Sequence, residues 1–504
     1  MKNKLTSLLF STLVGLLGFS CTDLEEKPIG VLAPEGLFKT VTDVQTAING
    51  AYGHIASEPL YGRNFVMALM LKSDMADIGD RTTAAARQQV NDFNMDASNG
   101  LVSSFWPRWY IVISSVNAAI RGGESLGLPQ EQINPTLAEA RFVRAFAYFH
   151  LVQNFGAIPY IDVFVTDPES VKAISKTPEE EVYARIIADL EFAKQWLPDQ
   201  QPADVRSRPT KGSAATCLAS VYLTQGNYQK AYTEAKWTID NKDKFGYRLE
   251  ADFQDLYIAT KADQIKETIF AVDFIGQKVG WDASNDDLMG AITGIRGTDQ
   301  NGWSVAVPSM KVYTSWDSRD YRKKVSFQDS MNIGGVLRPY TAFPTAARPH
   351  IAKFARFPGN SNSEGRDSDH NYFCFRYAEV LLIAAEALAE VNGGPNEEAM
   401  GYINQIRARA RNWAGRQTAF PANVTTGLSK QTFIDLVLEE RRLELAFEFK
   451  RWYDIKRRKL GDVVFKGANS FEPHANFTAA RDYLMPFLST EMTINPALTQ
   501  NPGY

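Results

Sequence analysis

The stretch AEARFVRAFAYFHLVQNFGAIPY, residues 138–160, indicates how this chain is built. Over 137–155, apolar side chains occupy almost every face of a helix. One face has Ala140, Val143, Ala147 and Leu151, and another has Phe142, Phe146 and Phe149. A helix that is apolar all round belongs inside a core. Gly156 and the nearby Pro159 end the pattern, as expected at a helix C-terminus. We therefore predict a buried helix over 137–155.

Two further segments predict helix–turn–helix hairpins of the tetratricopeptide type. In 212–241 the characteristic offsets hold Leu218, Ala219, Tyr222, Gly226, Tyr228 and Ala231. In 377–410 the same offsets hold Ala385, Leu388, Gly393 and Ala399. Single helices are predicted over 43–55, 105–121, 430–447 and 449–459. Because unrelated sequence separates the repeats, we expect a mainly α-helical scaffold with large insertions and not a continuous solenoid.

The N-terminus predicts a lipoprotein signal peptide. Lys2 and Lys4 make a basic start, residues 5–19 are mostly apolar, and Cys21 stands at the expected cleavage point. The apolar run is too short and wrongly flanked for a spanning helix. We therefore expect lipid on Cys21. The alternative is that Cys21 is an ordinary residue just past a conventional cleavage site.

The chain divides into four parts by composition and pattern. They are a signal peptide at 1–20, an N-terminal helical part at 21–242, a variable loop-rich insertion at 243–370, and a C-terminal helical part at 371–504. The insertion is rich in Gly, Asp, Asn and aromatic residues, with short β-like runs such as 268–274. Because binding residues concentrate in loops held on a rigid scaffold, we expect the ligand site in this insertion.

The composition argues against nucleic acid as a partner and against a spanning helix in the mature chain. The 504 residues are 44% hydrophobic, which is ample for a core. The formal net charge is −4, and no dense basic tract is present. Beyond the signal, no apolar run approaches the ~20 residues that span a bilayer. Three cysteines do not make a disulfide framework, so Cys217 and Cys374 are expected to be buried free thiols.

Catalytic motifs are not evident. The five histidines lack metal-ligand spacing, and no Walker loop, Gly-x-Ser-x-Gly elbow or dinucleotide fingerprint occurs. The adjacent carboxylates Glu439 and Glu440 lie in an arginine-rich helix. Spacings such as Glu439–Arg442 and Asp454–Arg458 predict ion pairs along that helical region. We therefore interpret these carboxylates as structural.

One loop bears on metal binding. Residues 360–371 loosely resemble an EF-hand calcium loop, but Asn371 stands at position 12, where glutamate is required. We therefore expect a plain polar loop, no metal site and no cofactor, in a protein that is not an enzyme.

Three regions of the chain together resemble one known family. They are the stretch 138–160 quoted above; FRYAEVLLIAAEALAEVNG at 375–393 with LEERRLELAFEFKRWYDIKR at 438–457; and the ending INPALTQNPGY at 494–504. With the lipoprotein signal, they resemble the SusD/RagB lipoproteins of Bacteroidetes glycan-uptake systems. The resemblance spans essentially the whole mature chain.

The resemblance implies a fold, a partner and a role. The implied SusD-like fold has four tetratricopeptide units on one side and a variable loop-rich region on the other. The implied partner is a SusC-like TonB-dependent β-barrel transporter, over whose mouth the lipoprotein sits as a lid. The family captures oligosaccharides, or peptides in the RagB branch, and is not catalytic. The acidic stretch 22–26 resembles the surface-export signal of such lipoproteins, and a solvated tether accounts for it equally.

A polar stretch supplies the first candidate ligand-binding residues, Asp74, Asp77 and Arg81, with Asp80 between them. In the layout of the resembled family this segment tends to border the ligand groove. A carboxylate next to a guanidinium can serve sugar hydroxyls, which both donate and accept hydrogen bonds. The alternative is a solvated loop with local ion pairs.

Aromatic residues in the insertion supply the second set of candidates. They are Trp281, Trp303, Tyr313 and Trp316, with Tyr340 as a weaker addition. Most lie close to Asp or Asn, and the face of a sugar ring packs flat on an aromatic ring while its hydroxyls bond at the edge. For each residue, packing between loops is the alternative. We predict a ligand groove formed by 74–81 and these aromatic loops.

The sequence thus predicts a lipid-anchored protein on the outer surface of the outer membrane that captures oligosaccharide or polysaccharide and passes it to the transporter. Two alternatives stay open. One is a peptide-binding uptake protein of the RagB type, and the other is a tetratricopeptide scaffold with only protein partners. Tryptophans beside Asp and Asn favour sugar, although the sequence does not specify which glycan.

Overall fold

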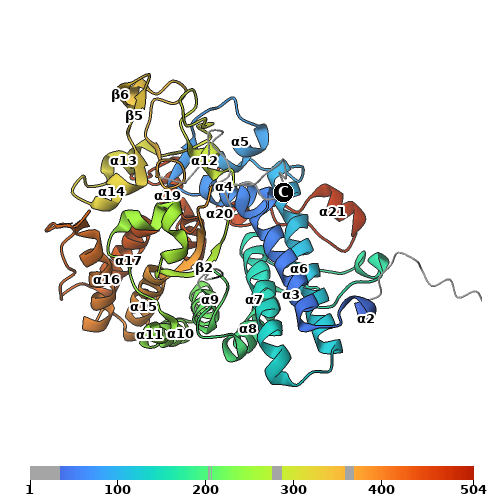
Figure 1. Cartoon of the computed structure of the whole chain (residues 1–504). Coiled ribbons are helices and arrows are strands. Elements are labelled where there is room, and N and C mark those ends of the chain that lie inside the picture. Colours follow the sequence, from blue (N-terminus) through green and yellow to red (C-terminus); the bar gives the residue numbers. More distant parts are fainter. Residues whose placement is uncertain (1–33, 203–204, 206, 275–286, 358–367) are drawn as a thin grey trace, which may run out of the picture.

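The computed structural model describes residues 34–202, 205, 207–274, 287–357 and 368–504. Long helices form the right, lower and left parts of the view in Figure 1, and much of the segment 287–351 lies above them. This arrangement confirms the mainly helical scaffold with a loop-rich region that the sequence predicts.

Most of the regular structure is helical. The α-helices are α2 (Pro34–Leu37), α3 (Val41–Ala56), α4 (Asn64–Leu71), α5 (Ala85–Asn91), α6 (Gly100–Ser125), α7 (Gln130–Phe155), α8 (Glu179–Trp196), α9 (Lys211–Thr224), α10 (Tyr228–Asp240), α11 (Lys242–Phe245), α12 (Met289–Thr293), α13 (Met310–Ser315), α14 (Tyr321–Ser326), α15 (Tyr377–Asn392), α16 (Glu397–Ala410), α17 (Lys430–Glu444), α18 (Arg451–Arg457), α19 (Gly461–Lys466), α20 (Ala479–Asp482) and α21 (Ser489–Ile494). Short 3₁₀ or π turns are η1 (Glu58–Gly62), η2 (Pro168–Val171), η4 (Phe253–Tyr257), η5 (Ala259–Gln264) and η7 (Tyr340–Ala342).

The scaffold helices pack in antiparallel-type pairs along the chain. The pairs are α3 with α6, α7 with α8, α9 with α10, and α15 with α16. Helix α10 packs on α15, so the row continues across the insertion. The predicted hairpins at 212–241 and 377–410 are therefore confirmed as α9–α10 and α15–α16. Between α9 and α10 the chain turns at Gly226, where φ is +72°, a conformation that glycine adopts without strain.

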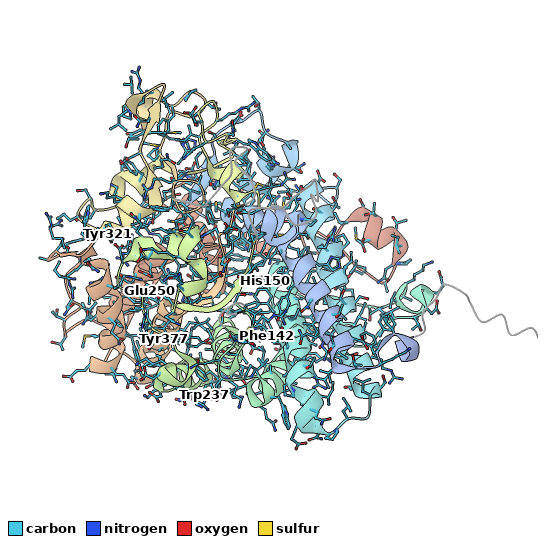
Figure 2. All side chains as sticks on the ribbon, in the orientation of Figure 1. Phe142, His150, Trp237, Glu250, Tyr321 and Tyr377 are labelled. Carbon is cyan, nitrogen blue, oxygen red and sulfur yellow. The ribbon has the colours of Figure 1, made fainter. Side chains whose placement is uncertain are left out.

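Helix α7 lies in the core, as its sequence predicts. Every residue from 142 to 155 is buried. Phe142 and Phe146 meet Phe270 of strand β2 edge to face, with ring centroids 4.9 and 5.2 Å apart. Phe142 and His150 both lie in the interior in Figure 2. Most of its sides are apolar because helices and a strand surround it, and the buried Arg144 pairs with Asp189 of α8.

Strands in the described residues pair only as short antiparallel ribbons. They are β1 (Ala76–Ile78) with β3 (Ala306–Pro308), β2 (Thr268–Val272) with β8 (Tyr372–Arg376), β4 (Phe327–Gln328) with β7 (His350–Ile351), β5 (Ser330–Ile333) with β6 (Val336–Pro339), and β9 (Asn412–Trp413) with β10 (Arg416–Gln417). The β2–β8 ribbon brings together two ends of the loop-rich region, with Thr268 opposite Arg376.

A buried network of ion pairs joins this ribbon to the C-terminal helices. Arg376 is 1% exposed and bonds Glu267 and Glu444 at 2.6 Å each through Nη1. Its Nε donates to Glu448 at 2.8 Å. Glu444 also pairs with Arg409 and lies 3.3 Å from Arg322. The guanidiniums hold the pKa of Glu444 far below its usual range despite its burial, which acts in the opposite direction.

The helical ion pairs follow the predicted pattern in part. Glu439 and Arg442 pair through an Nε–Oε2 bond of 2.7 Å, as predicted. The predicted Asp454–Arg458 pair is wrong, because Asp454 bonds Arg441 and Arg457 instead. Arg458 bonds Glu386 and Glu390 on α15. Arg458 therefore pairs with carboxylates of a neighbouring helix and not with Asp454, one turn earlier in the chain.

The prediction for the two thiols is also met. Cys217 and Cys374 are buried free thiols. Among the described helices, none combines the length and the apolar character that crossing a membrane requires.

Removing Glu444 should destabilise the fold strongly. Glu444→Ala leaves buried guanidiniums short of a countercharge, and we expect a loss of about 3–5 kcal/mol in the free energy of unfolding. The matched control is Glu181→Ala on α8, whose carboxylate pairs with Arg185 at the exposed surface. That change should cost at most about 0.5 kcal/mol. Urea unfolding of both variants measures the difference, and equal losses would show that the buried network is not a determinant of stability.

Candidate functional site

The β1–β3 ribbon places part of the predicted polar segment beside part of the aromatic segment. Asp77 of β1 lies opposite Val307 of β3. Beyond the ribbon, the backbone N–H of Asp80 donates to the carbonyl of Ser304 at 2.8 Å. Gly79 allows this approach, since a Cβ there would come within 2.5 Å of the Ser304 carbonyl oxygen. The segment with Asp77 and Arg81 therefore lies beside the segment that begins at Trp303.

Two predicted ligand residues lie in the interior instead. Asp74 is fully buried, and both of its oxygens accept bonds from Arg451, at 2.7 and 2.8 Å. Trp316 is 2% exposed and meets Phe327 edge to face, with centroids 5.3 Å apart. A sugar ring stacks only on a face that solvent can reach. We therefore correct the prediction for both: Asp74 anchors its segment and Trp316 fills the core.

The Asp77 side chain is buried, and the Arg81 side chain that pairs with it is exposed. The Asp77 side chain is 8% exposed, and its carboxylate accepts bonds from Arg81 at 2.9 Å, Arg348 at 3.0 Å and Asn91 at 3.0 Å. The Arg81 side chain is 49% exposed and also pairs with Asp92. At this position the side chain that a ligand can meet is thus the arginine and not the aspartate.

Trp303 and Tyr313 are half-buried at the surface. The Tyr313 ring meets Tyr340 at 5.7 Å and 70°, and the ammonium of Lys323 lies 4.4 Å from the Tyr313 ring centroid. The Tyr313 hydroxyl donates to Asp329 at 2.9 Å. Burial and this carboxylate raise the pKa of Tyr313 to about 12, which keeps the hydroxyl protonated. The predicted candidate Trp281 lies outside the described residues.

Sequence reasoning missed two arginines of this region. Arg296 pairs with Asp80, and Arg348 pairs with Asp77. We call Arg81, Arg296 and Arg348 the arginine cluster. No sequence signal marks the two additions, because each is a single arginine in a loop more than two hundred residues from its aspartate.

A chain of hydrogen bonds fixes the backbone beneath Arg296 and Arg348. The Arg296 N–H donates to Ser304 Oγ at 2.9 Å, and Ser304 Oγ lies 2.8 Å from His350 Nε2. His350 Nδ1 lies 3.0 Å from the carbonyl of Arg348, which can only accept, so Nδ1 is the protonated nitrogen. Burial lowers the pKa of His350 to about 4, so the ring is neutral and Nε2 accepts from the serine.

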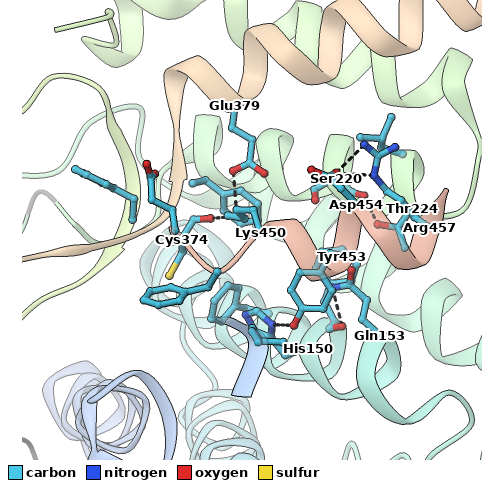
Figure 3. Close-up of a pocket in the computed structure, with 18 of the residues that line it drawn as sticks. His150, Gln153, Ser220, Thr224, Cys374, Glu379, Lys450, Tyr453, Asp454 and Arg457 are labelled. Carbon is cyan, nitrogen blue, oxygen red and sulfur yellow. Dashed lines mark hydrogen bonds and ion pairs between the residues drawn. The ribbon is translucent and has the colours of Figure 1, made fainter. Parts of the chain in front are cut away.

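The scaffold encloses a separate cavity of about 40 Å³ (Figure 3). His150 bonds the hydroxyls of Tyr61 and Tyr453 at 3.1 and 2.9 Å, and Lys450 pairs with Glu379 at 3.0 Å. Sites for small molecules usually measure roughly 300–1,000 Å³. This space is therefore a polar gap in the core and too small for a sugar ring.

The geometry defines a class of protein. A row of paired helices holds a loop-built surface with aromatic rings and outward guanidiniums, which is the architecture of a binding protein.

Comparison with known proteins identifies the family. The model described as "SusD family" matches residues 266–504, and the model described as "Starch-binding associating with outer membrane" matches residues 30–223. SusD-like protein P2 of Formosa agariphila is 48% identical, with all of both chains covered. A SusD-like protein of Bacteroides ovatus is 24% identical over 90% of this chain and 82% of its own length. The chain belongs to the SusD family, whose members are binding proteins without catalysis.

Solved structures support the same fold. A SusD homolog from Bacteroides thetaiotaomicron has a TM-score of 0.81 at 20% identity, covering 94% of this chain and 98% of that protein. A laminarin-binding SusD-like protein has a TM-score of 0.78 at 23% identity, covering 93% of this chain and all of that protein.

Truncating Trp316 should test its corrected role. Trp316→Ala removes a buried ring from the packing against Phe327, so we expect a loss of about 3–5 kcal/mol in unfolding free energy. Trp303→Ala removes a ring that is half-exposed and should cost clearly less. Thermal unfolding followed by circular dichroism compares the two. If Trp316→Ala unfolds at the wild-type temperature, the interior assignment of this ring is wrong.

Proposed function

We propose that this protein binds oligosaccharide or polysaccharide outside the outer membrane and passes it to a SusC-like TonB-dependent transporter. The observation that supports this most is that the segments beside the β1–β3 ribbon carry both half-buried aromatic residues, Trp303 and Tyr313, and the exposed Arg81. The laminarin-binding relative of the same fold adds support.

The chemistry of the surface suits sugar. A partly exposed aromatic ring offers a face for the C–H side of a sugar ring and excludes water from it, by analogy with aromatic pairs worth roughly 0.5–1.5 kcal/mol beyond burial. Exposed guanidinium N–H groups can donate to the hydroxyls of a bound sugar. The rings of Tyr313 and Tyr340 meet edge to face, and both residues are half-buried.

The proposed transfer follows from the family and the anchor. A lipid on Cys21 would hold the protein at the membrane, and about 0.8 kcal/mol per buried methylene makes more than one acyl chain sufficient for stable anchoring. A transporter in the same membrane is then the receiving partner. Cys21 lies outside the described residues, so this part rests on the signal sequence.

Binding to a ligand panel tests the function. Titration calorimetry against polysaccharides and then against peptides should show binding to a polysaccharide. Trp303→Ala and Tyr313→Ala should each weaken it by about 1–3 kcal/mol at a true anchor. The matched control is Trp237→Ala, because Trp237 is half-buried with Lys194 4.5 Å from its ring but lies on α10 of the helical scaffold, in the lower part of the view in Figure 2. Binding to peptides alone favours the RagB-type alternative, and binding to neither favours a scaffold.

Metabolic labelling tests the anchor. Cells that express the wild-type chain should incorporate a palmitate analogue into this protein. The Cys21→Ala variant should remain unlabelled because it lacks the thiol at the cleavage point. Protease treatment of intact cells separately tests surface exposure. Undiminished labelling of the variant would rule out Cys21 as the lipid site.

A further inference from the structure

We infer that the ligand is an anionic glycan, with carboxylate or sulfate groups that the arginine cluster binds. This inference rests on the proposed glycan-binding function and names the substrate class of the same surface. The side chains of Arg81, Arg296 and Arg348 are more exposed to solvent than the aspartates with which they pair.

The carboxylates lie below the guanidiniums. The side chains of Asp77 and Asp80 are each 8% exposed, whereas those of Arg81, Arg296 and Arg348 are 49%, 54% and 28% exposed. Hydrogen bonds from Thr82, and then from Arg296, keep the pKa of Asp80 below its usual range, so it is ionised. A ligand that reaches this surface therefore meets N–H donors first, with the negative charges behind them.

Arg296 and Arg348 keep donors for a ligand, whereas Arg81 uses Nη1 for Asp92 and Nη2 for Asp77. Within the described residues, hydrogen bonds engage one guanidinium nitrogen of Arg296, with Asp80, and one of Arg348, with Asp77. A guanidinium has five N–H donors in a planar fork that matches the two oxygens of a carboxylate or sulfate. A guanidinium bonded to such an anion makes two parallel bonds with charge on both partners, which is stronger and more specific than its single bond to a neutral hydroxyl. The open edges thus select an anionic substituent over a hydroxyl.

The cluster is held in place before a ligand arrives. The bonds from Arg296 N–H to Ser304, from Ser304 to His350, and from His350 to the Arg348 carbonyl join the two loops. The two oxygens of Asp77 hold Arg81 and Arg348 near each other. Side chains that are already oriented lose less entropy on binding, so each bond contributes more to affinity.

Acidic side chains near the arginine cluster limit its attraction for an anionic ligand to short range. Asp92 pairs with Arg81. Burial, and then the charge of nearby Asp77, raise the pKa of half-buried Glu472. The whole chain has a formal net charge of −4. A polyanion therefore gains little from the distant field of the protein, and recognition depends on direct contact with the three guanidiniums.

The test compares three polysaccharides by affinity electrophoresis and calorimetry. Laminarin serves as the neutral polymer, polygalacturonate as the carboxylate polymer and carrageenan as the sulfated one. We expect the wild-type protein to bind at least one anionic polymer about tenfold more tightly than laminarin, and to lose this advantage in high salt. Which anionic polymer binds distinguishes carboxylate from sulfate.

Arginine variants locate the site. Arg296→Gln and Arg348→Gln should each weaken anionic binding about tenfold, in line with one charge-assisted bond. Laminarin binding should change less than twofold. Arg185→Gln is the matched control, because Arg185 is 45% exposed and carboxylate-paired but lies on α8. Arg296→Lys and Arg348→Lys keep the charge and lose the fork, so they should weaken anionic binding as well, even if a glutamine variant fails to fold.

Failure of the inference differs from failure of the function. Wild-type binding to laminarin that equals or exceeds binding to both anionic polymers overturns the inference and leaves glycan binding intact. Anionic binding that is unchanged in folded Arg296 and Arg348 variants also overturns it. No binding to any of the three polymers, nor to a wider neutral panel, overturns both.

Discussion

Arg376 is almost wholly buried, and the way its charge is neutralised constrains the rest of the molecule. A guanidinium in the interior is tolerated only when carboxylates and carbonyls satisfy its donors. Here those groups come from Glu267 beside β2 and from Glu444 and Glu448 at the end of α17. Segments almost two hundred residues apart must therefore meet at one point. Alternative packings of the helices would leave a buried charge without a partner.

The same principle extends from the core to the ligand surface. Arg451, at the start of α18, holds both oxygens of Asp74, two residues before β1. One residue after α4, the buried Lys72 donates to the carbonyl of Asp482 at 2.9 Å. The segment that continues into Asp77 and Arg81 is thus attached to the scaffold on its inner side. Its outer side pairs with β3, which places the aromatic loops next to it.

Arginine has two different roles in this protein, one in the buried core and one at the surface. In the core, Arg376 and Arg409 both pair with Glu267 beside β2 and with Glu444 at the end of α17. At the surface, Arg296 and Arg348 each bond a buried aspartate through one nitrogen, and their side chains are 54% and 28% exposed. The aspartates orient the arginines in the second case, just as the arginines stabilise the glutamates in the first. A loop-built surface becomes rigid in this way without helices of its own.

By itself, the sequence determined the features that depend on neighbouring residues. Apolar spacing located α7 and the α9–α10 and α15–α16 hairpins, because helical periodicity repeats every few residues. Only the tertiary structure decided which polar and aromatic residues face a ligand. Asp74 and Asp77 look alike in the sequence, yet Arg451 buries the first, and two arginines share the second. Trp303 and Trp316 look alike too, and only packing against Phe327 removes Trp316 from the surface. Exposure depends on tertiary contacts, such as that of Asp74 with Arg451 far along the chain, which no local pattern records.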